Sequence, residues 1–334
     1  MAGNLNAERM VEVWRGGLLE SYHAGHAVIC DDKGSVIEAW GDPAAVVFPR
    51  SSAKMIQALP LIETGAADAF GLKEAQLAFA CASHIGQGFH VKMAEAWVTG
   101  LGLSEADLRC GSHEPGDKIE RDRLIAAGER PCQFHNNCSG KHSGFLTVTK
   151  HLGAGPEYVD IDHPLQKAIW QATADVTGEE AAGWGVDGCS APNIAMTVAG
   201  MARAMGRFAG ATGSGDARDR AMFRLASAMR AFPELVAGDT ASDTELMRAM
   251  DGRVTLKGGA EAYHIAIIPD LKRGIALKIV DGGARASDAV MTALLVRLGV
   301  LDAAHPAAKK RLNTVQKNWR GIETGTLQLA EGFL

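Results

Sequence analysis

The chain has 334 residues, of which 47% are hydrophobic and 22% charged, as in an ordinary globular protein with a sizeable core. Its 34 basic and 39 acidic side chains give a net charge of -5, which argues against nucleic-acid or membrane-surface binding. The first ten residues lack the basic and apolar regions of an export signal, and no segment has the apolar length of a transmembrane helix. We therefore expect a cytoplasmic protein whose six cysteines are reduced thiols.

The N-terminal region is predicted to form antiparallel strands. Residues 11–14, 26–30 and 36–40 are short apolar runs, and Asp-Asp-Lys-Gly joins the last two as a tight turn. From residue 51 to about 250 the apolar spacing is mostly helical, with Pro60 expected to kink the first helix.

Strands return near the C-terminus. Residues 263–268 and 274–280 are β-branched, apolar runs that predict a second hairpin. Residues 287–301 then predict an amphipathic helix with Ser287 as its N-cap.

This order predicts an α/β (α+β) fold. Strands from residues 1–50 and 251–334 should meet in one antiparallel sheet covered by helices. Residues 51–250 should form an inserted, mostly helical region that carries most of the site, and the whole is expected to form one compact unit.

Two serines and two lysines are candidates for nucleophilic catalysis. In Ser51-Ser-Ala-Lys54 a helix beginning at Ser51 would place the Lys54 amine near the Ser51 hydroxyl, and a neutral lysine can activate a serine. Ser83 ends an apolar segment, and Lys257 precedes two glycines that let a ligand approach the backbone. The plainer interpretation is helix-capping serines and surface lysines.

A polar, cysteine-containing segment is a candidate metal site. Cys138 and His142 are four residues apart, and Cys189 lies in a glycine-rich turn. Two thiolates and a nitrogen ligand suit zinc, although cysteines without paired spacing are more often simply buried.

Taken together, these segments resemble the bacterial L-asparaginase II family of the Rhizobium etli type. The resemblance spans nearly the whole chain, and its motifs are specific as an ordered set. The motifs are Arg15-Gly-Gly, Pro49-Arg-Ser-Ser-Ala-Lys54, Cys81-Ala-Ser-His84, Asn137-Cys-Ser-Gly-Lys-His142, Asp187-Gly-Cys189, Asp243-Thr-Glu-Leu-Met247 and Lys257-Gly-Gly-Ala-Glu261.

The resemblance implies a fold similar to serine β-lactamases and penicillin-binding proteins, and hydrolysis of L-asparagine by a homodimer. It implies that four residues carry the chemistry: Ser51, Lys54, Ser83 and Lys257. It implies three zinc ligands, namely Cys138, Lys141 and Cys189. Zinc held by a lysine, which must lose its proton to bind, is expected to have modest affinity and no direct catalytic role. Asp187, as an anion for the α-ammonium group, His142 and Arg50 are the expected substrate-binding residues.

Three functional hypotheses follow. In the first, an L-asparaginase, Ser51 is the preferred nucleophile and Ser83 the alternative. The second is a penicillin-recognising acyl hydrolase, which the lack of an export signal disfavours. The third is a non-catalytic, zinc-binding sensor of amino acids on the same fold.

Overall fold

The computed structural model describes residues 6–334, which fall into two compact units. The sheet unit comprises Met1–Ser52, Met196–Gly210 and Glu245–Leu334, and the helical unit comprises Ala53–Ala195 and Ala211–Thr244. Residues 1–5, part of the N-terminal segment predicted not to be an export signal, lie outside the described residues. That the whole chain forms one compact unit stays a prediction.

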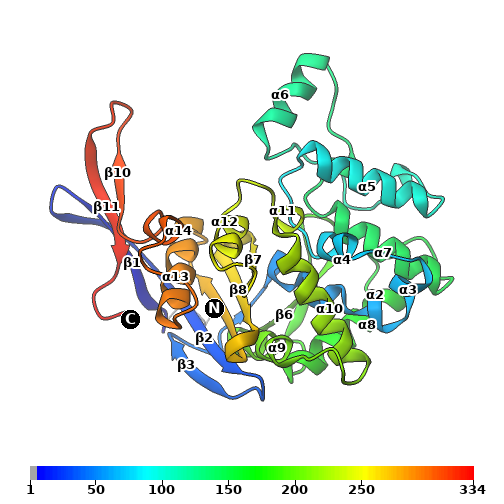
Figure 1. The fold of residues 1–334 in the computed structure, drawn as a ribbon, viewed down its shortest axis with the longest axis horizontal. Helices are drawn as coiled ribbons and strands as arrows, with labels where there is room; N and C mark the ends of the chain where they lie inside the picture. The colour runs from blue at the N-terminus through cyan, green and yellow to red at the C-terminus, as the bar shows by residue number, and fades with distance from the viewer. Residues whose placement is uncertain (1–5) are drawn as a thin grey trace. The chain divides into compact units, whose positions relative to one another are not determined.

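An antiparallel sheet built from both ends of the chain organises the sheet unit (Figure 1). Its strands follow the order β10-β11-β1-β2-β9-β8-β7, and β3 pairs with β2. The bounds are β1 Glu8–Arg15, β2 Leu18–Asp31, β3 Val36–Trp40, β7 Thr255–Gly259, β8 Tyr263–Ile268, β9 Arg273–Ile279, β10 Thr314–Lys317 and β11 Glu323–Leu329. The predicted fold class, with strands from the two termini in one sheet, is confirmed.

Helices cover both faces of this sheet, which explains why residues 27–30 of strand β2 are apolar on both sides. Ala27 and Ile29 belong to the core cluster formed with α12 (Ser242–Ala249), α13 (Ala284–Arg297) and α14 (Pro306–Lys309). Cys30, the next residue after Ile29, points to the other face, where its thiol lies 3.9 Å from the carbonyl oxygen of Ala199 in α9 (Val198–Gly210).

Helix α9 belongs to the sheet unit although its sequence position is inside the region predicted to be helical and separate. Two glycines allow the close approach. A Cβ on Gly206 would collide with the carbonyl oxygen of Asp31, and one on Gly274 would collide with the backbone of α9. The helix therefore packs directly on the backbone of β2 and β9, a contact that requires residues without side chains.

Short helices with one hairpin make up the helical unit. Its helices are α1 Lys54–Gln57, α2 Leu59–Glu63, α3 Ala66–Ala69, α4 Glu74–Ala80, α5 Gly88–Gly100, α6 Lys118–Ala127, α7 Ser139–His151, α8 Pro164–Thr177, α10 Ala217–Ala231 and α11 Pro233–Val236. The hairpin pairs β5 (Gly183–Val186) with β6 (Pro192–Thr197), whose last residues pair with β4 (Val46–Val47). Pro60 stands in the first turn of α2, so the predicted break in this helix is confirmed.

Two predicted helix starts were wrong. Helix α13 begins at Ala284, and the Ser287 hydroxyl donates to the Ala284 carbonyl oxygen at 3.0 Å instead of capping the helix. Ser51 lies in a 3-10 turn, Arg50–Ala53, and the α-helix begins only at Lys54. In a 3-10 turn the side chains at i and i+3 also lie on one side, so the change of helix type does not itself overturn the predicted pairing of Ser51 with Lys54.

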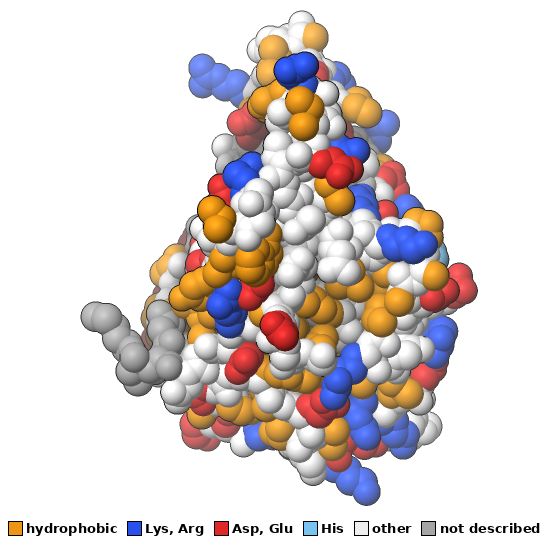
Figure 2. All heavy atoms as spheres, turned by 90° about the vertical axis from the view of Figure 1, so that its left-hand side faces the viewer, with side chains coloured by type: hydrophobic (Ala, Val, Ile, Leu, Met, Phe, Trp, Pro, Cys, Tyr) orange, Lys and Arg blue, Asp and Glu red, His pale blue; other side chains and the backbone are white. Residues whose placement is uncertain are grey.

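Two hairpins of the sheet unit, β1–β2 and β10–β11, extend outward in Figure 1, and their side of the molecule faces the viewer in Figure 2. Apolar and charged side chains are mixed on this face. Leu18 and Tyr22 of β2, and Trp319 between β10 and β11, are exposed large apolar side chains. Within residues 6–334, no helix combines the length and apolar character needed to cross a membrane.

The close packing of α9 leads to a stability prediction. Gly206→Ala should lower the free energy of unfolding by about 2 kcal/mol, because the new methyl group meets backbone that cannot move aside. Gly100→Ala is the matched control: it adds a methyl group at the end of α5, where nothing lies within 4 Å. Urea unfolding should show a reduced midpoint for Gly206→Ala alone, and equal midpoints would contradict the packing argument.

Candidate active site

Lys54 is the centre of the polar cluster in the helical unit. It is the first residue of α1, and its side chain is fully buried. Its Nζ lies 2.9 Å from the Ser83 hydroxyl and 3.1 Å from the Cys138 sulfur, and it also bonds the Ala82 carbonyl oxygen. One buried amine thus joins the start of α1, the segment after α4 and the N-cap of α7.

These three contacts fit Lys54 in either protonation state. An ammonium group has three protons to donate, and three partners surround it. A neutral amine has two protons and one lone pair, so it can donate twice and accept the proton of the Ser83 hydroxyl. A proton can therefore pass between Ser83 and Lys54 without any rearrangement of heavy atoms.

Ser83 has a partly exposed side chain but a fully engaged backbone. Its N–H donates to the Val236 carbonyl oxygen at 2.8 Å, and the next N–H, of His84, donates to the Asn137 carbonyl oxygen at 3.2 Å. Neither amide is therefore free to stabilise an oxyanion formed at Ser83.

His84 holds this segment in place and does not serve as a base. Its Nδ1 accepts the Gly86 N–H at 3.1 Å, so Nε2 carries the proton and donates to the Ser139 hydroxyl at 2.9 Å. Burial, followed by the neighbouring His90, holds the pKa of His84 well below its usual value. A neutral His84 thus ties the segment after Ser83 to the first residue of α7.

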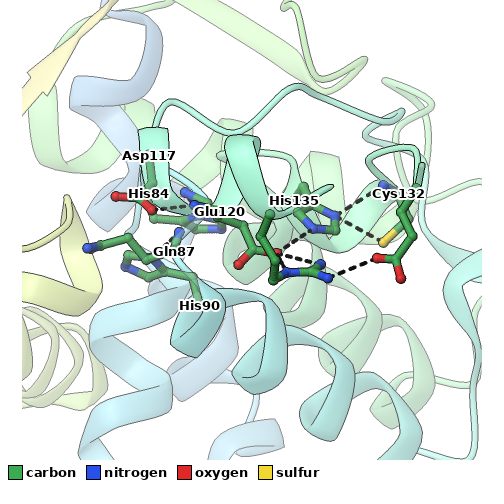
Figure 3. A network of polar contacts seen from close by, with 10 residues as sticks. His84, Gln87, His90, Asp117, Glu120, Cys132 and His135 are labelled. Carbon is green, nitrogen blue, oxygen red and sulfur yellow. Dashed lines mark hydrogen bonds and ion pairs between the residues drawn. The ribbon is translucent and has the colours of Figure 1, made fainter. Parts of the chain in front are cut away.

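His90 stacks on His84 with ring centroids 4.6 Å apart, and Figure 3 shows the two rings beside Gln87. Its Nδ1 accepts the Gln87 N–H at 3.1 Å, and its Nε2 donates to the Glu234 carbonyl oxygen at 2.9 Å. Burial lowers the pKa of His90 to about 4, because an added proton on Nδ1 would face an N–H donor inside an apolar stack.

The predicted metal ligands Cys138, Lys141 and Cys189 lie together and are buried. Lys141 Nζ lies 3.1 Å from the Cys189 sulfur. A hydrogen bond between the two cysteines lowers the pKa of Cys189 and raises that of Cys138. Burial lowers the pKa of Lys141, but the two sulfur atoms outweigh it and the net pKa is raised. These pKa shifts favour the proton on Cys138 and the charged form of Cys189, next to the Lys141 amine.

His142 stands next to this pair in a defined tautomer. The Tyr158 hydroxyl accepts the Arg109 N–H at 2.7 Å, so its single proton is donated to His142 Nδ1 at 2.8 Å. The imidazole proton is consequently on Nε2, a buried atom, and burial lowers the pKa of the ring against the opposing effect of the Cys189 sulfur. Tyr158 is a residue that sequence reasoning missed, because nothing in its local sequence links it to the cysteines.

Two sulfur atoms and an amine in one buried cluster fit the chemistry of a zinc site. Binding would require Lys141 and Cys138 to lose their protons, which lowers the net affinity. Within the described part of the chain, no three side chains of His, Cys, Asp or Glu are placed to hold a metal, and this includes the Glu120, His135 and Cys132 group of Figure 3. The predicted ligand set has only two such side chains, so its third ligand must be the lysine.

Asp187 lies at the edge of this cluster. Its Oδ1 accepts the Gly188 N–H at 2.9 Å, and its Oδ2 is 4.0 Å from the Cys189 sulfur. The side chain is half-buried, whereas His142 is fully buried. Of these two predicted substrate-binding residues, Asp187 has the exposure that a ligand contact requires.

In the sheet unit the turn that carries Ser51 is fastened to the strand that carries Lys257. The buried Ser52 hydroxyl is 3.1 Å from the carbonyl oxygens of both Lys257 and Tyr263. A Cβ on Gly259 would lie 2.8 Å from the Ser52 hydroxyl, so this glycine permits the contact. Lys257 is buried in β7 with its Nζ 2.6 Å from the Gly258 carbonyl oxygen, and is not part of an exposed turn.

Unfavourable backbone conformations flank the predicted site residues. Arg50 (φ 52), Ser190 (φ 69), Glu261 (φ 60) and Ala262 (φ 55) have positive φ without being glycine. Each stands beside or close to Ser51, Cys189 or Lys257 in the chain. Such conformations persist where the surrounding structure holds them, and they concentrate at functional sites. Residue types alone did not indicate this strain.

The structure therefore brings the predicted residues together as two groups. Lys54, Ser83 and the Cys138–Lys141–Cys189 cluster lie in the helical unit, with His142 and Asp187 beside the cysteines. Arg50, Ser51 and Lys257 lie in the sheet unit. Lys278 also belongs to the sheet unit, and burial lowers its pKa against the opposing charges of Glu261 and Asp281.

Comparison with known proteins gives one family match. The model of the family described as L-asparaginase II matches residues 11–329. No curated protein matches the chain.

Several solved structures are distantly similar. Mglu in its native form is 14% identical with a TM-score of 0.43, over 84% of this chain and 66% of Mglu, so the chain spans about two thirds of Mglu's length. A β-lactamase from Mycobacterium bovis is 14% identical with a TM-score of 0.45, over 82% of this chain and 94% of that protein. An octameric penicillin-binding protein homologue from Pyrococcus abyssi is 14% identical with a TM-score of 0.37, over 89% and 80%. Likeness at this level identifies no substrate.

The stacked His90 leads to a prediction on pH. Burial lowers the pKa of His90 from 6.5 to about 4 in the folded chain. Between these two pH values the unfolded chain therefore has a proton on His90 that the folded chain lacks. Stability from His90 is present above pH 6.5 and is lost as the pH falls toward 4, by about 3 kcal/mol. His90→Gln should flatten this dependence in urea unfolding, whereas His151→Gln, at an exposed histidine, should leave it unchanged. Equal slopes for His90→Gln and the parent protein would contradict the prediction.

Proposed function

The chain belongs to the L-asparaginase II family, and from this premise we propose that it hydrolyses L-asparagine to L-aspartate and ammonia by serine–lysine catalysis. Membership makes it an asparaginase-type amidohydrolase that acts on a small molecule. The observation that carries the mechanism is the contact of 2.9 Å between Lys54 Nζ and the Ser83 hydroxyl, because it pairs a buried amine with a partly exposed serine.

Lys54 is the proposed base and Ser51 the proposed nucleophile. Support for Ser51 is its place in the family motif, directly after Arg50, whose backbone is strained. Backbone amides do not separate the two serines, because the Ser52 N–H donates to the Pro49 carbonyl oxygen at 3.1 Å, just as the amides of Ser83 and His84 are engaged. The alternative is direct attack by Ser83, with the same lysine as base.

In the proposed reaction a serine proton passes to neutral Lys54 as the serine oxygen attacks the side-chain amide carbon. The tetrahedral intermediate collapses when Lys54 returns the proton to the amide nitrogen, which leaves as ammonia. An ester remains on the serine. Lys54 then removes a proton from water, whose oxygen attacks the ester, and the proton returns to the serine oxygen as L-aspartate departs.

Charge complementarity supports the assignment of Asp187 to the α-ammonium group of the substrate. The carboxylate is half-buried, which strengthens a charge-assisted hydrogen bond relative to one in water. Arg50 is proposed for the α-carboxylate, since a guanidinium group binds a carboxylate through two parallel bonds. His142, which is fully buried, would act on the site through Cys189.

We propose zinc as the ion held by Cys138, Lys141 and Cys189, on the strength of two buried cysteines and the Lys141 amine 3.1 Å from the Cys189 sulfur. When bound, it would neutralise the thiolates and orient the substrate without activating water. The Nε2 proton of His142 would stabilise the Cys189 sulfur. The homodimer and the cytoplasmic location expected from the sequence stay predictions.

Ammonia release from purified protein tests the proposed function. Activity with asparagine is expected, and Lys54→Met should lower kcat by about 10²–10⁴-fold because the base is lost. Lys167→Met, at an exposed lysine of α8, is the matched control and should retain activity. Asparagine binding without ammonia release would favour the sensor hypothesis, and rapid acylation by a penicillin the acyl-hydrolase hypothesis.

Two measurements identify the nucleophile. Ser51→Ala should abolish ammonia release, and peptide mapping of a trapped acyl-enzyme should place the adduct on Ser51. An adduct on Ser83 would make that serine the nucleophile, and full activity of Ser51→Ala would remove the central claim.

Metal content tests the zinc proposal. Purified protein should hold about one zinc ion per chain, as expected for a site of this kind, and Cys189→Ser should lose it. Cys110→Ser is the matched control, because Cys110 is also buried but lies outside the predicted ligand set. Elemental analysis that finds equal zinc in Cys189→Ser and the parent protein would contradict the proposal.

A further inference from the structure

An open pocket of about 280 Å³ lies within the sheet unit, apart from every residue assigned above. Charged and hydrogen-bonding side chains from α13, the segment after α14 and β10 line it, and these are Arg285, Asp288, Lys310, Arg311, Thr314 and Gln316. Leu327 of β11 adds an apolar surface. This region is where α13 and α14 meet the outer strands of the sheet (Figure 1).

Two of the cations are held in place by one carboxylate. Lys310 Nζ and Arg311 Nη2 both bind the same oxygen of Glu245, at 2.9 Å and 2.7 Å. The Arg311 side chain is only 7% exposed, and its Nη1 donates to the Ala307 carbonyl oxygen at 2.8 Å. Arg311 is therefore a rigid positive charge and has little side-chain entropy left to lose on binding a ligand.

The third cation, Arg285, is positioned by a neutral histidine. His23 Nδ1 lies 2.6 Å from Asp281 Oδ2, so it donates there and leaves Nε2 as an acceptor for Arg285 Nε at 2.9 Å. Among the described residues, Arg285 makes no salt bridge, and its side chain is exposed. Glu20, whose pKa Arg285 helps to lower, is paired with Arg15 at 2.9 Å.

The charges around the pocket are equal in number but unevenly paired. Glu245 holds both Lys310 and Arg311, and Asp281 is bonded to His23, so Arg285 is the cation that makes no hydrogen bond to a carboxylate among the described residues. Gln316 adds an amide donor, whereas the Thr314 hydroxyl donates to the Lys310 carbonyl oxygen at 3.0 Å and can only accept. A guanidinium group can bind a carboxylate or a phosphate with two parallel hydrogen bonds.

We propose that this pocket is a binding site for a small oxyanion, either a carboxylate or a phosphate, with Arg285 as the group that contacts it directly. A pocket of about 280 Å³ has room for a small metabolite. The site is independent of the proposed catalytic function, because none of its lining residues takes part in the serine–lysine chemistry or in the zinc cluster.

Calorimetric titration of the full chain with inorganic phosphate, and separately with succinate, tests the site. Neither probe carries the α-ammonium group expected for the substrate. Saturable binding is expected for at least one probe, and the stronger of the two identifies the ligand class. Raising the potassium chloride concentration should weaken binding, because the attraction is electrostatic.

Arg285→Gln should weaken binding at least about tenfold, as expected for loss of one charge-assisted pair. Arg297→Gln is the matched control, since Arg297 is an exposed arginine on the same helix, paired with Glu38 at 2.8 Å. It should change the affinity less than about twofold, because exposed surface pairs contribute little. Equal weakening by both variants would indicate general surface charge and overturn the proposal, as would the absence of saturable binding of either probe.

Discussion

The buried amine of Lys54 is the constraint on which the helical unit's polar cluster depends. It bonds the Ala82 carbonyl oxygen, the Ser83 hydroxyl and the Cys138 sulfur, which come from separate segments of the chain. If the buried amine lost one of these partners, the free-energy cost of removing it from water would no longer be offset by that hydrogen bond. The local structure after α4 and at the start of α7 is therefore held by the same group that is proposed to act as the base.

Around Lys54, burial and hydrogen bonds fix the protonation and orientation of several histidines. His84 and His90 are kept neutral by burial, so they contribute hydrogen bonds of fixed direction and no proton chemistry near pH 7. Tyr158 fixes the tautomer of His142 beside Cys189 in the same way. Hydrogen bonds from neighbouring groups thus fix the donor and acceptor nitrogens of these histidines, whereas Lys54 and Ser83 can exchange a proton between them.

In the sheet unit, the main constraint is the close approach of backbone segments. Gly206 and Gly274 allow α9 to pack on β2 and β9, and Gly259 allows Ser52 to bond the strand that carries Lys257. Residues 196–210 are thereby joined to strands from both ends of the chain. The position of the Ser51 turn against β7 thus depends on glycine as much as on any hydrogen bond.

The sequence by itself determined the fold class, several element boundaries and the family. Tyr263–Ile268 forms a strand as predicted, because β-branched apolar periodicity is a local property. Only the tertiary structure decided that α9 belongs with the sheet, that Lys54 contacts Ser83, and that a neutral His142 faces Cys189. Those outcomes depend on contacts between residues far apart in the chain, whose energies no local pattern encodes. Ser287 shows the converse. Serine is a good N-cap, but the helix begins one turn earlier, at Ala284, in the folded protein.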